Sequence, residues 1–106
     1  MARLSWKYTG GYNPADFAAS LTFDETVALK DEEKLLFVSA VASAASKALV
    51  TGLEDGQCMF VSNIGGTNAF TVKNLATDSG SSLATGKVAL VIGSTTANAT
   101  KIYVLN

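Results

Sequence analysis

The residues that most often carry enzymatic chemistry are sparse in this chain. Its 106 residues include no histidine and a single cysteine, Cys58, so the commonest general base and metal ligand is missing. One cysteine builds neither an intrachain disulfide nor a thiolate zinc site, and Cys58 lies in an apolar run, where cysteine is usually a small core residue. Carboxylates remain as candidates for catalysis, because a pair of Asp or Glu side chains can catalyse glycoside hydrolysis. The candidates are Glu25, Glu32, Glu33, Glu54 and Asp55.

Most of these carboxylates fall in segments that have the composition of charged turns, residues 31–33 and 54–55. Charged side chains in turns are normally only solvated, so we expect no catalytic role for them and no enzymatic activity. The loop "TDSGSS" offers Asp78 and serine oxygens to a cation, but a solvated loop explains the same residues. We therefore expect neither a metal site nor a cofactor.

The glycine pair in "IGGTN", residues 64–68, raises the question of a phosphate-binding loop. Such a loop needs a helix after its glycines, so that backbone N–H groups and the helix dipole face the anion. Here "AFTVKN" follows, which alternates and is β-branched and aromatic. We therefore predict the tip of a β-hairpin, in which glycine supplies a positive φ.

Period-2 alternation predicts the surrounding elements. In "CMFVSN" the residues Cys58, Phe60 and Ser62 fall on one face, and Met59 and Val61 on the other. Comparable runs recur every 10 to 15 residues with turns between them. This spacing predicts an all-β domain over residues 21–106, a small antiparallel β-sandwich or jelly-roll-like barrel.

Two segments need separate treatment. "VSAVASAASKALV", residues 38–50, fits either an alanine-rich helix or two short strands with a turn near residues 44–46, and we favour the strands. "KVALVIG", residues 87–93, is apolar on both faces, so both faces should be covered. We expect one of them to pack against another subunit. The subunit-packing candidates are Val88, Leu90, Val91 and Ile92.

The composition limits the partners. Apolar residues make up 48% of the chain and charged residues 16%, with a net charge of −1, against about 25% charged residues in typical globular chains. A small-residue surface of low charge suits packing against other subunits. The basic residues are spread singly, so we expect no binding to nucleic acid. We also expect no signal peptide and no membrane span.

The first 20 residues differ from the rest and predict an extended N-terminal arm. A short alternating run, "RLSWKY", is followed by two glycines and the only proline. Aromatic residues and arginine are enriched among interface anchors, so this arm is a candidate contact with a partner. It could instead dock on its own domain, with Trp6 plugging the core. The interface candidates are Arg3, Leu4, Trp6, Tyr8, Tyr12 and Pro14.

Residues 52–106 show a recognisable order of motifs. A "DGQ" turn is followed by a strand ending in Asn, then "GGTNAFTVKN", a polar loop, "LATGKVALV" and a closing strand "KIYVLN". This order resembles modules found in small structural proteins of tailed bacteriophages, namely capsid decoration (cement) proteins and head fibres. The match is weaker back to residue 21, and the chain lacks the long shaft and repeats of tail fibres.

The resemblance implies a non-enzymatic virion protein with a β-sandwich or jelly-roll-like fold that forms a homotrimer. The brevity of the chain favours a capsid decoration protein that binds the major capsid protein and stabilises the head. Such a protein is assembled in the host cytoplasm and resides on the capsid surface. The alternative is a receptor- or carbohydrate-binding module of a head or tail fibre, with the loop at residues 94–100 as a candidate glycan contact.

Overall fold

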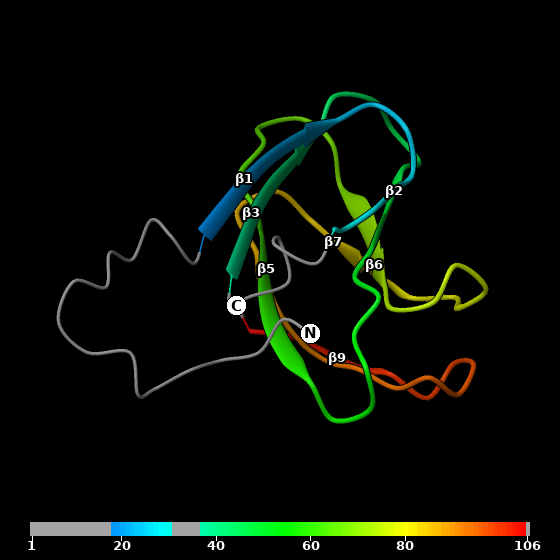
Figure 1. Ribbon diagram of the computed structural model, residues 1–106. Coiled ribbons are helices and arrows are strands. Elements are labelled where there is room, and N and C mark those ends of the chain that lie inside the picture. The colour runs from blue at the N-terminus through cyan, green and yellow to red at the C-terminus, as the bar shows by residue number, and fades with distance from the viewer. Residues whose placement is uncertain (1–17, 31–36, 106) are drawn as a thin grey trace, which may run out of the picture.

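The computed structural model describes residues 18–30 and 37–105, and these residues form two mixed β-sheets and no helix (Figure 1). The five-stranded sheet has the order β1-β3-β5-β8-β9, and the four-stranded sheet has the order β2-β4-β6-β7. The strands are β1 Ala18–Phe23, β2 Val27–Ala28, β3 Phe37–Ala42, β4 Ala48–Val50, β5 Cys58–Asn63, β6 Phe70–Lys73, β7 Ser81–Leu83, β8 Val88–Ile92 and β9 Lys101–Val104.

The all-β class predicted from the sequence is confirmed, but the antiparallel pairing is wrong for much of the molecule. Within the described residues, four strand pairings are parallel: β1–β3, β3–β5, β2–β4 and β4–β6. The β5–β8, β6–β7 and β8–β9 pairings are antiparallel. Parallel pairing arises because strands that follow each other in sequence lie in different sheets, so each chain segment crosses over before it returns.

The two sheet orders match position by position. The pairs β1/β2, β3/β4, β5/β6 and β8/β7 occupy equivalent places in the two sheets, and the members of each pair are neighbours in sequence. Each pair with its short connection is therefore a β-arch that spans the core, and the arches stack. Val38 lies beside Val61 and Leu49 beside Val72, a spacing of 23 residues in both sheets. Among the strands of residues 18–30 and 37–105, β9 alone has no counterpart in the four-stranded sheet.

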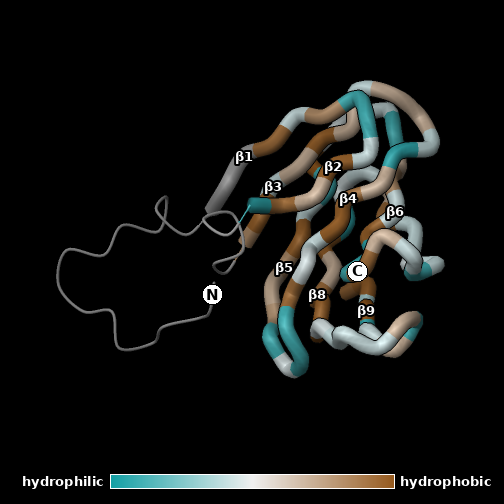
Figure 2. The backbone as a smooth tube through the Cα atoms, turned by 45° about the vertical axis from the view of Figure 1, so that its right-hand side comes forward, coloured by the Kyte–Doolittle hydropathy of each residue, from teal (hydrophilic) through white to brown (hydrophobic). Residues whose placement is uncertain are grey.

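One hydrophobic core lies between the sheets, and alternation along the strands fills it. In β3 and β5 every second residue is buried, among them Val38 and Val61 at 0% exposure. The Phe23 and Phe70 rings, from different sheets, meet edge to face with centroids 5.3 Å apart. Hydrophobic residues follow the strands and hydrophilic residues gather at the connections (Figure 2). The period-2 pattern in the sequence thus separated the two faces of these strands correctly, but the core position expected for Cys58 is wrong, because Cys58 is half-buried on the outward face of β5.

Two fully buried asparagines fasten the arches. The Asn63 amide donates to the backbone carbonyls of Asn68 and Leu83, both at 2.9 Å, and its carbonyl accepts from the Gly65 N–H. Asn74 makes an analogous set of bonds to residues on two other connections, those that follow β4 and β8. Buried polar side chains are tolerated when every group is bonded, and here no buried side-chain donor or acceptor in the described part of the chain lacks a partner.

The segment at residues 38–50 forms strands, as favoured. It folds as β3, a turn at residues 43–46 and β4, with Ser46 at a φ of 62°. Val38, Ala40 and Ala42 are buried at alternate positions. Small residues let the neighbouring arches approach closely, which explains an alanine-rich composition without a helix.

The hairpin predicted at "IGGTN" is wrong. The segment at residues 64–69 connects β5 of the five-stranded sheet to β6 of the four-stranded sheet and is an arch. Neither glycine of the pair is among the glycines with positive φ. Gly65 is needed for another reason: a Cβ built there would lie 2.5 Å from the Val41 Cγ2 atom. The glycine allows this connection to pack against the preceding arch.

Two further expectations differ in detail. The polar loop expected at residues 76–86 contains β7. The first strand begins at Ala18, before the boundary expected at residue 21. The charged turn at residues 31–33 lies outside the described residues.

Candidate interaction surface

The outward face of the five-stranded sheet carries a continuous row of large apolar side chains. The pairing register places Phe37 beside Phe60, Phe60 beside Leu90 and Leu90 beside Tyr103, so one side chain from each of β3, β5, β8 and β9 lies in line. We call these four residues the outer row. The Phe37 and Phe60 rings are 6.2 Å apart and tilted by 31°. Tyr103, at the edge, is 51% exposed.

The structure separates the subunit-packing candidates into two groups. Val88, Leu90 and Ile92 are half-buried on the outward face, where they extend the outer row along β8. Val91 points into the core and has 0% exposure, together with Ala89. Val91 therefore belongs to the domain's own core, and the outward face of β8 is what remains for a partner.

Strand β9 extends beyond the edge of the four-stranded sheet. Val104 pairs with Ala89 and Ile102 with Val91, so their side chains lie on the core-facing side of the sheet. Val104 is nevertheless 46% exposed, because no described strand of the four-stranded sheet lies opposite β9. We call the core-facing side of β9, formed by Ile102 and Val104, the β9 overhang. Together with Tyr103 and Leu105, which is 53% exposed, it makes β9 the most exposed apolar strand described.

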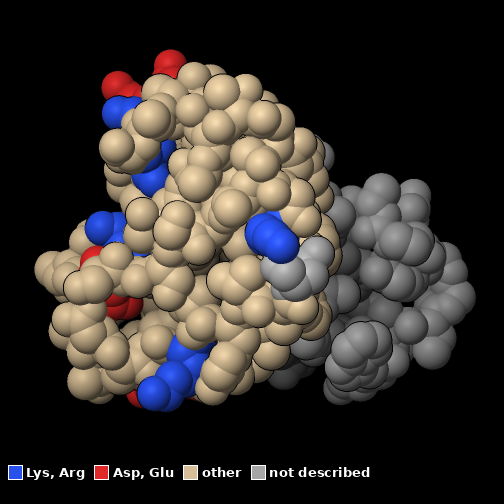
Figure 3. Space-filling view, turned by 180° about the vertical axis from the view of Figure 1, so that it is seen from behind, with Lys and Arg blue, Asp and Glu red and all other residues tan. Residues whose placement is uncertain are grey.

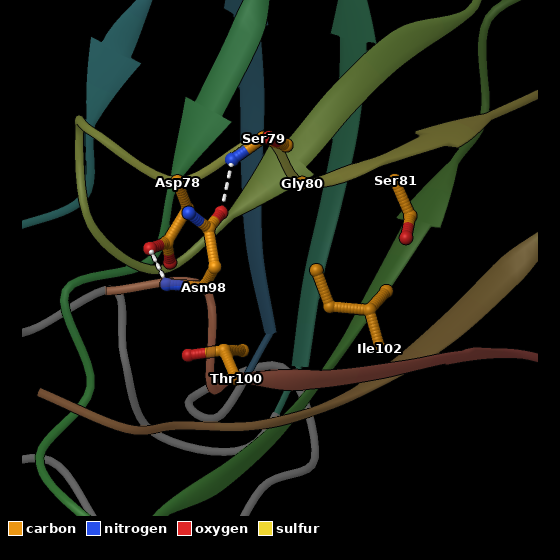
Figure 4. A pocket seen from close by; sticks show the side chains of 7 residues that line it. All are labelled: Asp78, Ser79, Gly80, Ser81, Asn98, Thr100 and Ile102. Carbon is orange, nitrogen blue, oxygen red and sulfur yellow. Dashed lines mark hydrogen bonds between the residues drawn. The ribbon is translucent and has the colours of Figure 1, made fainter. Parts of the chain in front are cut away.

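A cleft of about 320 Å³ lies beneath the β9 overhang, beside β7. Figure 4 shows Ser81 of β7 and Ile102 of β9 on opposite sides of it, with Asp78 and Asn98 at one end. The cleft is thus apolar where β9 overhangs and polar where two loops meet. The lining residues are Asp78, Ser79, Gly80, Ser81, Asn98, Thr100 and Ile102.

The polar end of the cleft is a clamp between two loops. The Asp78 carboxylate accepts hydrogen bonds from the Asn98 N–H at 2.7 Å and the Leu75 N–H at 3.0 Å. In return the Asn98 side-chain carbonyl accepts from the Ser79 N–H at 2.8 Å. Asp78 is only 6% exposed, so the solvated loop expected from the sequence is wrong for this residue. The side chain organises its own loop and fixes residues 94–100 to it.

These contacts set the charge state of Asp78. Burial raises the pKa of its carboxyl, but hydrogen bonds from the backbone of Asn98, Leu75 and Asn74 outweigh burial. The charge of Lys73 acts in the same direction, and the net pKa lies below the usual value. The carboxylate is therefore ionised at neutral pH, and its oxygens are engaged by the chain itself.

The carboxylates considered for catalysis do not form a reactive pair. Asp55 accepts from the N–H and hydroxyl of Thr95 at 2.7 and 3.0 Å, and these bonds lower the pKa of its carboxyl. Glu25 and Glu54 are exposed, while Glu32 and Glu33 lie outside the described residues. Among the residues that the structure describes, no group of three or more Asp, Glu or Cys side chains is placed to hold a metal ion.

The interface candidates of the arm, Arg3, Leu4, Trp6, Tyr8, Tyr12 and Pro14, also lie outside the described residues.

The surface of the described residues, apart from the outer row and the β9 overhang, is weakly charged. On the face in Figure 3, most charged side chains lie along one side and at the lower rim, and a broad area between them is uncharged. Within residues 18–30 and 37–105, no helix is long and apolar enough to cross a membrane.

Sequence reasoning missed part of this surface. Phe37 and Tyr103 were not singled out, although each lies in an alternating apolar run that a search for a second apolar face would have found. The β9 overhang has no local signal in the sequence, because it follows from the unequal number of strands in the two sheets.

Comparisons with models of known protein families, with curated proteins and with solved structures gave no match.

Proposed function

We propose that this chain is a non-enzymatic virion structural protein, a capsid decoration protein that binds the major capsid protein and stabilises the head. The observation that carries the proposal is the outer row with the β9 overhang. Monomeric proteins rarely expose contiguous large apolar patches unless these bind something. On a body with so little charge, the natural use of such a surface is contact with other protein subunits.

The fold suits this role. The two sheets, taken as a β-sandwich, are fastened by the buried bonds of Asn63 and Asn74, which makes the body rigid. A rigid partner loses little conformational entropy on binding. A homotrimer, with the outward face of β8 at the subunit contact and the arm at the capsid or a neighbouring subunit, accounts for the apolar surface. The motif order of residues 52–106, which resembles phage virion modules, points to the capsid as the partner.

The test uses capsids of the phage that encodes the chain, stripped of this protein. Added protein should sediment with the capsids and raise the temperature at which they release DNA. Tyr103→Asp places a charge on the outer row, at the proposed subunit contact, and should weaken capsid binding at least tenfold because separated copies bind singly. Ile64→Asp is the matched control, because Ile64 is comparably exposed at 58% but lies in an arch connection away from the row. Equal capsid survival with and without the protein, and no co-sedimentation, would rule out the proposal.

One observation favours the alternative of a carbohydrate-binding module in a fibre. The cleft beside β7 brings Asn98 and Thr100, from the loop considered as a glycan contact, next to Ser79 and Ser81. Hydroxyl and amide groups of this kind bind sugar hydroxyls. A glycan array together with labelling of virions separates the two functions: glycan binding and tail labelling support the fibre module, and head labelling supports decoration.

A further inference from the structure

The edge of the four-stranded sheet and the β9 overhang together form a position for one more strand. We infer that residues 3–8 of a neighbouring copy of the chain occupy it as a fifth strand, paired with β7. The inference deepens the proposed function and rests on its homotrimer, since it states how the copies hold each other. Three observations lead to it: the open edge of β7, the uncovered side chains above it, and the pattern of the segment.

The first observation is the direction of the backbone groups of β7. The Thr71 N–H donates to the Lys47 carbonyl, so Thr71 directs its backbone groups toward β4. Its neighbours Phe70 and Val72 therefore direct theirs toward β7, where they pair with Leu83 and Ser81. The N–H and C=O of Ser82, between those two residues, consequently point to the open edge. An added strand can pair with them, as extended segments do at sheet edges.

The second observation is what such a strand would cover. The two sheets match strand for strand except at β9, whose core-facing Ile102 and Val104 have no strand opposite in the part of the chain that the structure describes. The cleft of about 320 Å³ lies at this place. A strand beside β7 would insert every second side chain there, against Ile102 and Val104. Those side chains should be apolar, and the ones between them, on the outward face beside Ser82, should be polar.

The third observation is that residues 3–8 have this pattern. The segment "RLSWKY" alternates between polar and apolar residues over six positions, the period of a strand with one covered face. Its apolar members are Leu4, Trp6 and Tyr8, and its polar members are Arg3, Ser5 and Lys7. In the added strand the apolar members would enter the cleft and the polar members would face solvent.

The reach of the chain favours a neighbouring copy over the same copy. β1 and β9 are opposite edges of the five-stranded sheet, about 19 Å apart at the usual strand spacing, and the second sheet lies about 10 Å below. Residues 9–17 join residue 8 to Ala18 through ten Cα–Cα steps, about 33–36 Å when fully extended. Within one copy this linker would have to run largely extended past the end of the core, which costs conformational entropy. Between copies the same contact is heterologous, and repeated around a threefold axis it closes a ring.

The test is disulfide trapping on the purified protein. In a Cys58→Ser background, Ser82→Cys is combined with Ser5→Cys, and residues 3 and 7 are tried in turn because the register is open. Directly opposed side chains in paired strands have Cβ atoms about 4.5–5.5 Å apart, close to the distance a disulfide spans. The matched control replaces Ser82→Cys by Ala28→Cys, because Ala28 is also exposed and lies on β2, the other edge strand of the same sheet.

Covalent dimers and trimers on a denaturing, non-reducing gel are expected for at least one pair that includes Ser82→Cys, and no such species for the pairs with Ala28→Cys. A disulfide formed within one copy, equal trapping at both edges, or no trapping at any of the three arm positions would overturn the inference. Far-UV circular dichroism identical to the parent protein confirms that each variant folds. Since no capsid is present, trapped trimers that then fail to bind capsids would refute the proposed function and leave this inference standing.

Discussion

The buried side chain of Asn74 gives the sharpest test of how the arches are held. It has 0% exposure and follows the end of β6. Its carbonyl oxygen accepts from the Thr51 hydroxyl at 2.6 Å and from the Leu53 N–H at 2.5 Å. Its amide donates to the carbonyls of Leu53 and Ser94, both at 2.9 Å. One side chain, on the connection that follows β6, thus satisfies four groups on the connections that follow β4 and β8.

Asn74→Ala would leave these four groups without their partner. An unsatisfied buried group costs about 1–3 kcal/mol, and water entering the space left by the amide recovers part of that cost. We expect a loss of about 3–5 kcal/mol, a large share of the 5–15 kcal/mol that typically holds a domain folded. At an m-value of about 1.5 kcal/mol/M, the urea midpoint should fall by about 2–3 M.

The assay is urea denaturation followed by far-UV circular dichroism. Asn68→Ala is the matched control, because the Asn68 amide donates a single part-buried bond, to the Ala42 carbonyl at 2.8 Å. Its loss should cost about 1 kcal/mol. If Asn74→Ala costs no more than Asn68→Ala, the buried asparagine does not fasten the arches and the reasoning is wrong.

Three other predictions concern the arch packing, the loop clamp and the outer row. Gly65→Ala should lower the free energy of unfolding by about 1–3 kcal/mol, since the added Cβ meets the preceding arch, whereas Gly66→Ala, which meets nothing within 4 Å, should change it by about 0.5 kcal/mol or less. The folded pKa of Asp78 lies below the usual aspartate value of 3.8, so the stabilisation that Asp78 provides is present above the unfolded pKa and lost as the pH falls through the folded pKa. Asp78→Asn should therefore reduce the acid dependence of thermal unfolding. Phe60→Ser with Tyr103→Ser should shift sedimentation equilibrium toward monomer while the circular dichroism spectrum is kept.

Each of these has a result that would contradict it. Equal destabilisation by the two glycine substitutions would mean that the close approach to Val41 is not what requires glycine. If the acid transition of Asp78→Asn is unchanged, the hydrogen bonds of Asp78 between the two loops do not cause the acid sensitivity of the fold. An unchanged association constant in the outer-row double variant would exclude that row from the subunit contact.

The inward faces of the strands could be predicted from the sequence because burial imposes its period directly. Met59 and Val61 were assigned to one face of a strand, and both are buried. The segment at residues 69–74 was predicted to alternate, and its alternate residues Phe70 and Val72 are also buried. The pattern is insensitive to the partner strand, since a residue points inward whichever strand lies beside it. The same property explains why pairing could not be predicted: alternation around "IGGTN" is identical for a hairpin and for an arch.

The candidate surface was only partly predictable for a related reason. Leu90 and Ile92 were found because β8 is apolar on both faces, and the error on Val91 came from treating the whole run as surface. The outer row depends on register between strands distant in sequence, such as Phe37 beside Phe60, which no local pattern encodes. The polar clamp was hidden because an aspartate that bonds to backbone N–H groups has the same local sequence as one in solvent.

Decoration of a capsid by this chain is best tested by an electron cryomicroscopy map of the virion whose genome encodes it. Density that fits the two stacked sheets is expected on the outer surface of the head, in threefold groups, with the outer row or the β9 overhang at a protein contact. A head surface without this density, or the same density on the tail, would contradict it.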